Sequence, residues 1–314
     1  MYRDEYYENR GARLSYRRFE KAGAPTLLGL HGFNDTARTF HFIEPMLERH
    51  FDLFFMDWRG HGKSSPLQEG YYNASVLFGD LSTFTGDLLP DSYFLMGHSM
   101  GAAVAARFAG IFPDEIRGLI LFEGFSGVVP VQNEIDRLRT WAQGLRKKRP
   151  ARERVMKNIR IVRESLGMMH PRMNPEQIEF FADAWTRPAP GEADGLLWHM
   201  DPGLRENFSP LPFPWYLSRA LWNQIRCPVL LFFGKETPLR PGISPEKAYT
   251  KYEAKEGQAG EERMEGDEAL REIMSHFQDI ELHDLEGCGH NMHHDRPDEV
   301  ARIIEDWLGR KALL

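Results

Sequence analysis

Short apolar runs alternate with amphipathic stretches through the first 125 residues of the chain. Four of these runs have the length and composition of strands buried on both faces, namely residues 26–30, 51–56, 93–96 and 118–122. Between them, residues 40–47 and 74–88 have helical patterns, and an alanine-rich helical stretch follows Gly101. Strands that alternate with helices at such short intervals are typical of βαβ units. The pattern therefore predicts an α/β fold whose mainly parallel sheet is flanked by helices.

The alternation stops after the fourth run and resumes about a hundred residues later. Residues 126–222 contain helical segments rich in arginine and aromatic residues, with proline-rich breaks and no convincing strand. Strand patterns return at 227–234 and 280–285. We therefore expect a core built from residues 1–125 and 223–314, with a helical cap of residues 126–222 inserted over the active end of the sheet.

Three further stretches complete the expected organisation. Residues 6–20 alternate weakly between polar and apolar, as a pair of edge strands does. Residues 244–272 are polar and charged with scattered glycines, which predicts an exposed excursion of two helices or partial disorder, with no part in the chemistry. Residues 297–309 have the pattern of a terminal helix.

Charge and cysteine content exclude several classes of protein. The chain carries a formal net charge of −7 at pH 7, so nucleic-acid phosphates would repel it. Cys227 and Cys288 are too few for a disulfide scaffold and lack the spacing of metal ligands. The polar, acidic N-terminus is unlike a signal peptide, and no apolar run approaches the ~20 residues of a membrane span. These features predict a cytoplasmic protein without nucleic-acid partners, stable membrane insertion, metal or cofactor, and leave its oligomeric state open.

One segment departs from this acidic balance. Residues 137–172 hold twelve Lys and Arg against two Asp and Glu. Such a segment can attract an anionic substrate or a membrane face. A solvated helix surface explains the same composition, and we favour that interpretation.

The candidate chemistry centres on Gly97-His98-Ser99-Met100-Gly101, which lies between a predicted strand and a predicted helix. A strand that turns sharply into a helix strains the backbone at the bend, and glycines two positions either side give the crossing room. Ser99 would project from this bend beside the unpaired N–H groups of the helix start, which suit an oxyanion formed next to its hydroxyl. The pattern indicates a nucleophilic serine.

Three further motifs accompany the serine motif, namely His31-Gly32-Phe33, Asp57-x-Arg59-Gly60-His61-Gly62-x-Ser64 and Gly289-His290. In this order and at these spacings the chain resembles the α/β-hydrolase superfamily, and within it serine hydrolases of the esterase and lipase type that carry a helical cap. The resemblance spans most of the chain outside residues 126–222. It implies that His290, on a loop after the last strand, is the base that activates Ser99.

The acid that orients the histidine is where the sequence departs from this family. Most members carry an aspartate shortly after the strand that here ends at Gly234, and that position is Thr237. Two carboxylates are candidates to replace it. Glu123 follows the strand after the serine helix, a place from which some capped members present the acid, and Glu236 lies one residue before the usual position. We favour Glu123, because a longer side chain from the neighbouring strand end can reach the same histidine nitrogen.

The remaining motif residues receive supporting roles. The backbone N–H groups of Phe33 and Met100 are the expected oxyanion hole. Asp57, Arg59 and His61 are interpreted as structural residues that tie down their turn, and His98 as a packed wall residue. A last pair, His293 and His294, lacks the accompanying ligands of a metal site, so we expect solvated side chains at a helix start.

The expected function is hydrolysis of a carboxylic ester, or a related acyl compound, through an acyl-enzyme. Serine at position 99 argues against the family branches that form an ester on an aspartate. Aromatic and methionine residues of the cap suggest a small-molecule substrate with an apolar acyl or aryl group, although most of them are expected to fill the cap's own core; they are Trp141, Met168, Met169, Phe180, Phe181, Trp185, Trp198, Phe208, Trp215, Tyr216 and Trp222. The alternative is a non-hydrolytic or C–C-bond-cleaving member of the same fold, or a binding module with a degenerate triad.

Overall fold

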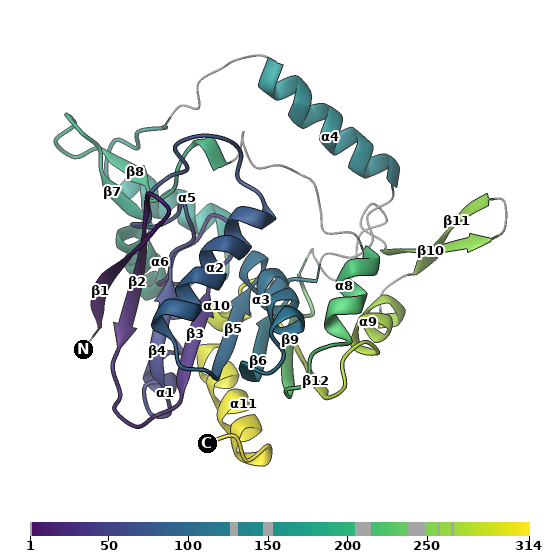
Figure 1. The fold of residues 1–314 in the computed structure, drawn as a ribbon. Coiled ribbons are helices and arrows are strands. Elements are labelled where there is room, and N and C mark those ends of the chain that lie inside the picture. The colour runs from purple at the N-terminus through teal and green to yellow at the C-terminus, as the bar shows by residue number, and fades with distance from the viewer. Residues whose placement is uncertain are drawn as a thin grey trace.

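The computed structural model describes residues 2–125, 131–146, 153–204, 215–237, 249–255, 258–264 and 267–314. Its main feature is an eight-stranded sheet with the order β1-β2-β4-β3-β5-β6-β9-β12 (Figure 1). Its strands, in chain order, are β1 (Arg3–Asn9), β2 (Ala12–Phe19), β3 (Thr26–Leu30), β4 (Asp52–Met56), β5 (Tyr93–His98), β6 (Ile116–Phe122), β9 (Val229–Gly234) and β12 (Ile280–Leu285). The pairs β1–β2 and β2–β4 are antiparallel, and every other neighbouring pair is parallel.

The central strands are mostly apolar because helices cover both faces of the sheet. In β5, Tyr93 and Leu95 pack into the cluster that holds residues of α2 (Ala74–Leu88) and α3 (Met100–Ile111). Phe94 and Met96 point the other way, into the cluster that holds residues of α11 (Pro297–Arg310). Figure 1 shows α2 and α3 on the near face of the sheet. Successive residues of a strand point to opposite faces, so a strand covered on both faces needs no polar position.

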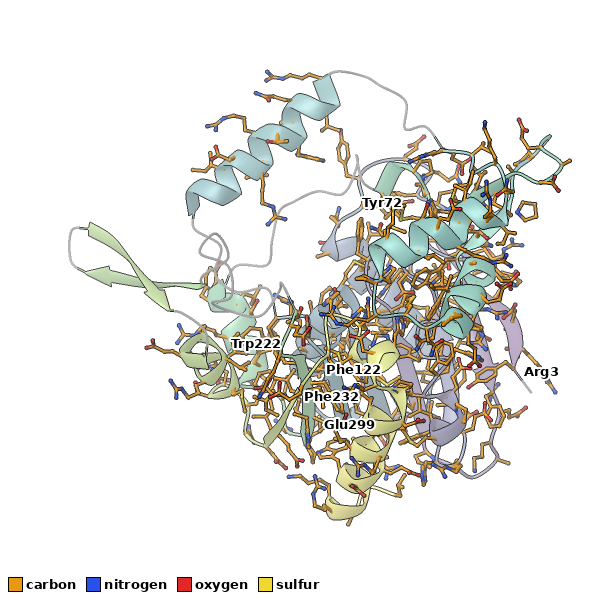
Figure 2. The ribbon with its side chains drawn as sticks, turned by 180° about the vertical axis from the view of Figure 1, so that it is seen from behind. Arg3, Tyr72, Phe122, Trp222, Phe232 and Glu299 are labelled. Carbon is orange, nitrogen blue, oxygen red and sulfur yellow. The ribbon has the colours of Figure 1, made fainter. Side chains whose placement is uncertain are left out.

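An aromatic contact joins β6, the neighbour of the serine strand β5, to the next strand of the sheet, β9. Phe122 at the end of β6 stacks on Phe232 of β9, with ring centroids 4.9 Å apart (Figure 2). Both rings are fully buried. This contact brings the carboxyl ends of β6 and β9 together, and the residues that follow them come from adjacent positions on the sheet edge.

The α/β prediction is confirmed, and most predicted elements lie where the pattern placed them. The helix predicted at 74–88 is α2, and the terminal helix is α11. The edge strands expected within 6–20 are β1 and β2. The helix predicted at 40–47 is shorter than expected: residues 39–43 form successive turns, and only α1 (Glu44–Leu47) is helical.

Residues 126–222 are referred to below as the insertion. Its described elements are α4 (Val131–Arg146), α5 (Ile159–Met169), α6 (Pro175–Ala184), β7 (Thr186–Pro188), β8 (Leu196–Trp198) and α8 (Trp215–Trp222). The expectation of no strand here was wrong, because β7 and β8 pair as an antiparallel hairpin. Each has three residues, which is too short to give a recognisable alternation. α8 packs on α3, where Gly110 lies so close to α8 that an added Cβ would be 2.2 Å from the Leu221 carbonyl oxygen.

The insertion contacts the core at several places. The backbone of His199 and Asp201 pairs with that of Gly62 and Gly60, through N–H···O bonds of 2.8 and 2.7 Å. Elsewhere the buried Gln177 amide of α6 donates to the carbonyl of His294, 2.6 Å away in α10 (Met292–Asp295). α4 touches the core through Trp141, whose ring meets Tyr71 edge-on with centroids 5.2 Å apart.

The excursion after β9 is a hairpin, so the expectation of two helices across 244–272 was wrong. β10 (Tyr249–Lys255) and β11 (Gln258–Met264) pair antiparallel, and α9 (Asp267–Met274) follows them. Residues 244–248, 256, 257, 265 and 266 of that prediction lie outside the described part of the chain. Among the helices that the structure describes, none combines the length and apolarity required to cross a membrane.

Candidate active site

Ser99 lies on the sharp turn between β5 and α3. Its backbone has φ 51° and ψ −114°, a conformation that costs a non-glycine residue about 1–3 kcal/mol. The turn is held by the Ser99 N–H, which donates to the Phe122 carbonyl 2.9 Å away. Flanking glycines are required, because a Cβ on Gly97 would lie 2.6 Å from the Ala102 nitrogen and one on Gly101 would lie 2.2 Å from the Leu30 oxygen. The strained turn that the sequence predicted is present.

His290 and Glu123 meet beside this turn. The distance between His290 Nδ1 and Glu123 Oε2 is 2.6 Å. The carboxylate is 1% exposed and the imidazole 26% exposed, so the histidine faces outward from a buried acid. A carboxylate only accepts hydrogen bonds, so Nδ1 carries the proton and Nε2 is the nitrogen free to take another.

Two further groups donate to Glu123. The Thr237 hydroxyl lies 3.0 Å from Oε2, and the Gly234 N–H lies 3.3 Å from Oε1. Glu123 itself has a positive φ of 56°, on the strand end next to that of Ser99. Thr237, where the resemblance led us to look for an aspartate, therefore donates a hydrogen bond to the Glu123 carboxylate.

Glu236 lies elsewhere. Its side chain pairs with Arg172 of the insertion, and both groups are substantially exposed. Its backbone N–H donates to the Cys288 carbonyl 2.9 Å away. Of the two carboxylates that the sequence left as candidates, the structure brings Glu123 to His290 and directs Glu236 to the insertion.

The loop of His31, Gly32 and Phe33 lies directly beside the serine. A Cβ on Gly32 would be 2.9 Å from Nδ1 of the buried His98 and 3.2 Å from the Cβ of Ser99, so this close approach favours glycine. Phe33 is 37% exposed, and its ring meets His61 edge-on. Met100 is the first residue of α3, where helix N–H groups have no partner within the helix. Phe33 and Met100 thus come from the two segments that border Ser99.

His31 fixes this loop, a role that sequence reasoning missed. The buried ring donates from Nδ1 to the Gly32 carbonyl at 2.7 Å and accepts at Nε2 from the Trp58 N–H at 3.0 Å. Burial and the neighbouring His61 hold the pKa of His31 well below its usual value, so the ring is neutral. The sequence does contain a signal for this role, because the His-Gly pair is part of the motif and its histidine was given no other function.

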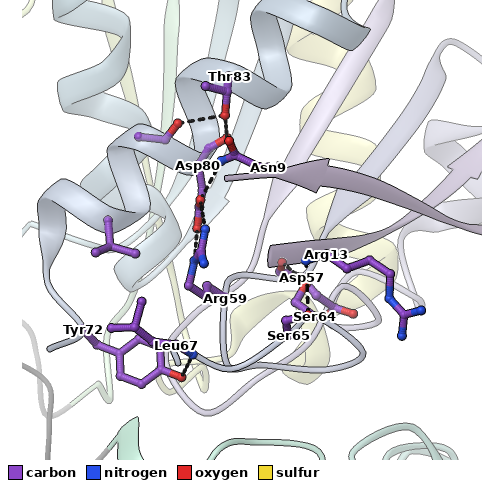
Figure 3. Close-up of polar contacts among 12 residues, drawn as sticks. Asn9, Arg13, Asp57, Arg59, Ser64, Ser65, Leu67, Tyr72, Asp80 and Thr83 are labelled. Carbon is purple, nitrogen blue, oxygen red and sulfur yellow. Dashed lines mark hydrogen bonds and ion pairs between the residues drawn. The ribbon is translucent and has the colours of Figure 1, made fainter. Parts of the chain in front are cut away.

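The structural interpretation of the Asp57 turn is confirmed. Asp57 accepts from the N–H groups of Ala37 and Lys63 at 2.7 and 3.0 Å. Arg59 binds Asp80 of α2 through two hydrogen bonds of 2.9 and 2.6 Å (Figure 3). His61 is also buried. These contacts tie Asp57 and Arg59 to their neighbours, and His61 is enclosed in the same turn.

The expectation of solvated His293 and His294 was wrong, because both are 1% exposed. The Thr39 hydroxyl lies 2.9 Å from His293 Nε2, and His294 donates from Nε2 to the Thr39 carbonyl at 2.8 Å. α10 is covered by the insertion through Gln177, a contact between residues 117 positions apart. The helix start was predicted correctly, but its cover comes from distant parts of the chain.

The aromatic and methionine residues of the insertion lie in several different surroundings. Phe181 and Trp185 belong to the insertion's own core, and Trp222 belongs to the main core. Met168, Met169 and Tyr216 are 77%, 55% and 75% exposed. Phe208 and the side chain of Trp215 lie outside the described residues. The expected filling of the insertion's core is confirmed for part of the set.

Acidification is expected to destabilise the fold through its buried histidines. Burial lowers the pKa of His61 to about 4 and of His294 to about 3, and it holds that of three others well below the usual value, namely His31, His98 and His293. The unfolded chain binds these protons near pH 6.5, so the free energy of unfolding falls as the pH drops below 6.5. For His61 the loss accumulates down to about pH 4 and reaches about 3 kcal/mol.

Two buried aspartates act in the opposite direction. Burial raises the pKa of Asp35 to about 7 and also raises that of Asp57, so they favour the folded state as the pH falls. The loss of unfolding free energy from the five histidines is larger than the gain from the two aspartates. The Tm is therefore expected to fall between pH 7 and pH 5 in thermal melts. His61→Asn keeps a donor for the Arg59 carbonyl, which Nδ1 reaches at 3.2 Å, and should flatten the pH dependence. A Tm that stays constant over this range would contradict the assignment of neutral histidines.

A family model described as the alpha/beta hydrolase family matches residues 27–303. N-formylmaleamate deformylase of Pseudomonas putida is 34% identical over 113 residues, which cover 36% of this chain and 42% of the deformylase. Protein phosphatase methylesterase 1 of Candida albicans is 31% identical over 127 residues, which cover 38% of this chain and 35% of the methylesterase. The chain thus matches less than half the length of these curated relatives.

A solved structure extends the likeness over the whole fold. The thioesterase domain from the curacin biosynthetic pathway superimposes with a TM-score of 0.75 at 20% identity, covering 97% of this chain and 99% of that domain. At this identity the match bears on the fold. The family model spans strands β4, β5, β6, β9 and β12, the serine turn and the His290 loop together, whereas β1 and β2 precede the matched residues. The chain belongs to the α/β-hydrolase family.

Proposed function

We propose that this protein hydrolyses a carboxylic ester through an acyl-enzyme formed on Ser99, with His290 as general base and Glu123 as the orienting acid. The observation that carries the proposal is the 2.6 Å contact from His290 Nδ1 to the buried Glu123, beside the strained turn of Ser99. A serine hydroxyl needs a base in reach and a third group that holds the base in the correct tautomer. Family membership supports hydrolase chemistry in general.

In the proposed mechanism, His290 Nε2 takes the proton of the Ser99 hydroxyl as its oxygen attacks the substrate carbonyl. The N–H groups of Phe33 and Met100 stabilise the oxyanion, each contributing about 3 kcal/mol. The protonated imidazole then gives its proton to the leaving alcohol, and water cleaves the acyl-enzyme by the same route. Glu123 stays ionised throughout, supported by Thr237 and Gly234, and stabilises the imidazolium.

The relatives support acyl transfer to water, but they do not narrow the substrate to one class of acyl compound. One is a methylesterase and another is a deformylase. An ester with an apolar acyl or aryl group suits the exposed Phe33 and the exposed methionines of the insertion. The likeness to the deformylase favours an N-acyl compound as the second candidate substrate.

Labelling with a fluorophosphonate tests the nucleophile. Mass spectrometry of the digested protein is expected to find the adduct on Ser99, because only a serine activated by a base reacts readily. A panel of p-nitrophenyl esters of increasing acyl length then measures hydrolysis, beside a matched panel of N-acyl anilides. An unlabelled Ser99, with no turnover of either panel, would favour a binding module with a degenerate triad.

A further inference from the structure

His98 joins the serine strand to the loop of His290. It is the last residue of β5, directly before Ser99, and is 3% exposed. Its Nε2 lies 3.1 Å from the main-chain oxygen of His290. The rings of these two histidines are 4.7 Å apart between centroids, and the ring of His293 is 4.6 Å from that of His98. His98, which the sequence led us to expect as a packed wall residue, therefore contacts His290, the proposed base.

The proton of His98 can be placed from its surroundings. A carbonyl oxygen only accepts, so the Nε2 that faces His290 carries the hydrogen. Nδ1 is buried, and within the described residues it has no hydrogen-bond partner. A proton there would be an unpaired buried donor, which costs about 1–3 kcal/mol. Burial, with His290 and His294 nearby, also holds the pKa of His98 well below its usual value. The ring is therefore neutral, with its hydrogen on Nε2.

The side chain and the main chain of His290 are held by residues at the carboxyl ends of two different strands. Its side chain is held by Glu123, which follows β6, through the contact at Nδ1. Its main chain is held by His98 at the end of β5. The next residue back, Gly289, is held within its own loop by Asp295, whose carboxylate accepts the Gly289 N–H at 2.7 Å. Among these contacts, the one from His98 links the main chain of the base to the strand that carries the nucleophile.

We propose that His98 is a positioning residue that sets the distance between Ser99 and the imidazole of His290 by donating its Nε2 hydrogen to the His290 carbonyl. The inference rests on the proposed function and adds to it a residue that touches neither substrate nor reacting atoms. A shift of about 1 Å in a reacting group can lower the rate about 100-fold. Because the anchor acts on the main chain, its loss lowers kcat and leaves substrate binding largely intact.

Three substitutions test this role. His98→Gln places an amide N–H near the position of the imidazole Nε2, whereas the shorter His98→Asn does not reach the His290 carbonyl, and His98→Leu removes the donor. We expect His98→Leu and His98→Asn to lower kcat about 10- to 100-fold with KM within about threefold, and His98→Gln to stay within about fivefold of wild type. If His98→Leu does not fold, the Gln and Asn variants alone decide.

A matched control separates positioning from stability. Ile304 is buried in the terminal helix α11, and Ile304→Val is expected to lower stability by about 0.5–1.5 kcal/mol without changing kcat. Equal kcat in the Gln and Asn variants, or an unchanged kcat in the Leu variant, would overturn the role of His98. This test can be separated from that of the proposed function. If fluorophosphonate labels Ser99 in the wild type but the His98 variants keep their kcat, only the role of His98 is wrong. If Ser99 of the wild type is not labelled, both the proposed function and the role of His98 are wrong.

Discussion

Ser99→Ala is expected to lower kcat for ester hydrolysis about 10⁶-fold. The methyl group cannot form the acyl-enzyme, and the remaining oxyanion donors and binding contacts retain only a small part of the rate enhancement. The substitution is not expected to change the backbone of the turn, because the hydrogen bond to the Phe122 carbonyl and the close packing at the flanking glycines do not involve the Ser99 side chain. Initial rates on a p-nitrophenyl ester, measured with enough enzyme to detect the residual activity, give the comparison.

The matched control is Ser82→Ala, which removes an exposed serine of α2. Its kcat should equal that of wild type. The fluorophosphonate adduct should disappear from Ser99→Ala and remain in Ser82→Ala. Comparable esterase activity in Ser99→Ala would show that another residue performs the attack and would end the proposed mechanism.

Glu123→Gln is expected to lower kcat about 10⁴-fold while the fold is retained. A neutral amide cannot stabilise the imidazolium that forms during attack, and its NH₂ group allows the wrong tautomer of His290. The loss should be larger for kcat than for KM, because the carboxylate acts on the base and does not contact substrate. Steady-state kinetics on the same ester measure both constants.

Glu236→Gln is the control for this prediction because it is the same substitution on the neighbouring carboxylate. Its exposed pair with Arg172 is worth about 0–1 kcal/mol, so activity should stay within about fivefold of wild type. A loss of several orders of magnitude in Glu236→Gln, with little effect in Glu123→Gln, would reverse the assignment of the acid.

The sequence predicted those parts of the fold that local patterns determine. The runs that became β3, β5 and β12 have strong alternation or continuous apolarity, and the glycines around Ser99 mark the turn because no other residue fits there. The location of His290 followed from the order of motifs. The signals for the strands and for the turn lie within a few positions of the residues they describe, whereas His290 was identified from motifs spread along the chain.

Choosing between Glu123 and Glu236 required information that no local pattern holds. Glu123 reaches His290 because β9 lies next to β6 in the sheet, so that the Thr237 hydroxyl and the Gly234 N–H surround its carboxylate. Strand order is set by contacts between residues more than a hundred positions apart, such as Phe122 with Phe232. The side chain of Glu236 is directed away by Arg172, which comes from the insertion.

The burial of His293 was hidden for the same reason. Apart from Met292 its sequence neighbours are polar, and its cover includes Thr39, a residue 254 positions away. The short strands β7 and β8 were missed because three residues are too few for a period to emerge. The hairpin of β10 and β11 was missed because a charged, glycine-containing segment gives no strand pattern.

The placement of the carboxylate after β6 has a consequence for how this chain can diverge. In a protein whose acid follows β9, any lengthening of the β9–α9 connection risks moving a charge that has to be held to a fraction of an ångström. Here, under the proposed roles, that connection retains a supporting hydroxyl at Thr237, directly before the stretch that carries the β10–β11 hairpin. Natural or engineered variation in loop length is therefore best tolerated beyond Thr237, and a foreign segment grafted there leaves the reacting groups on their own strands.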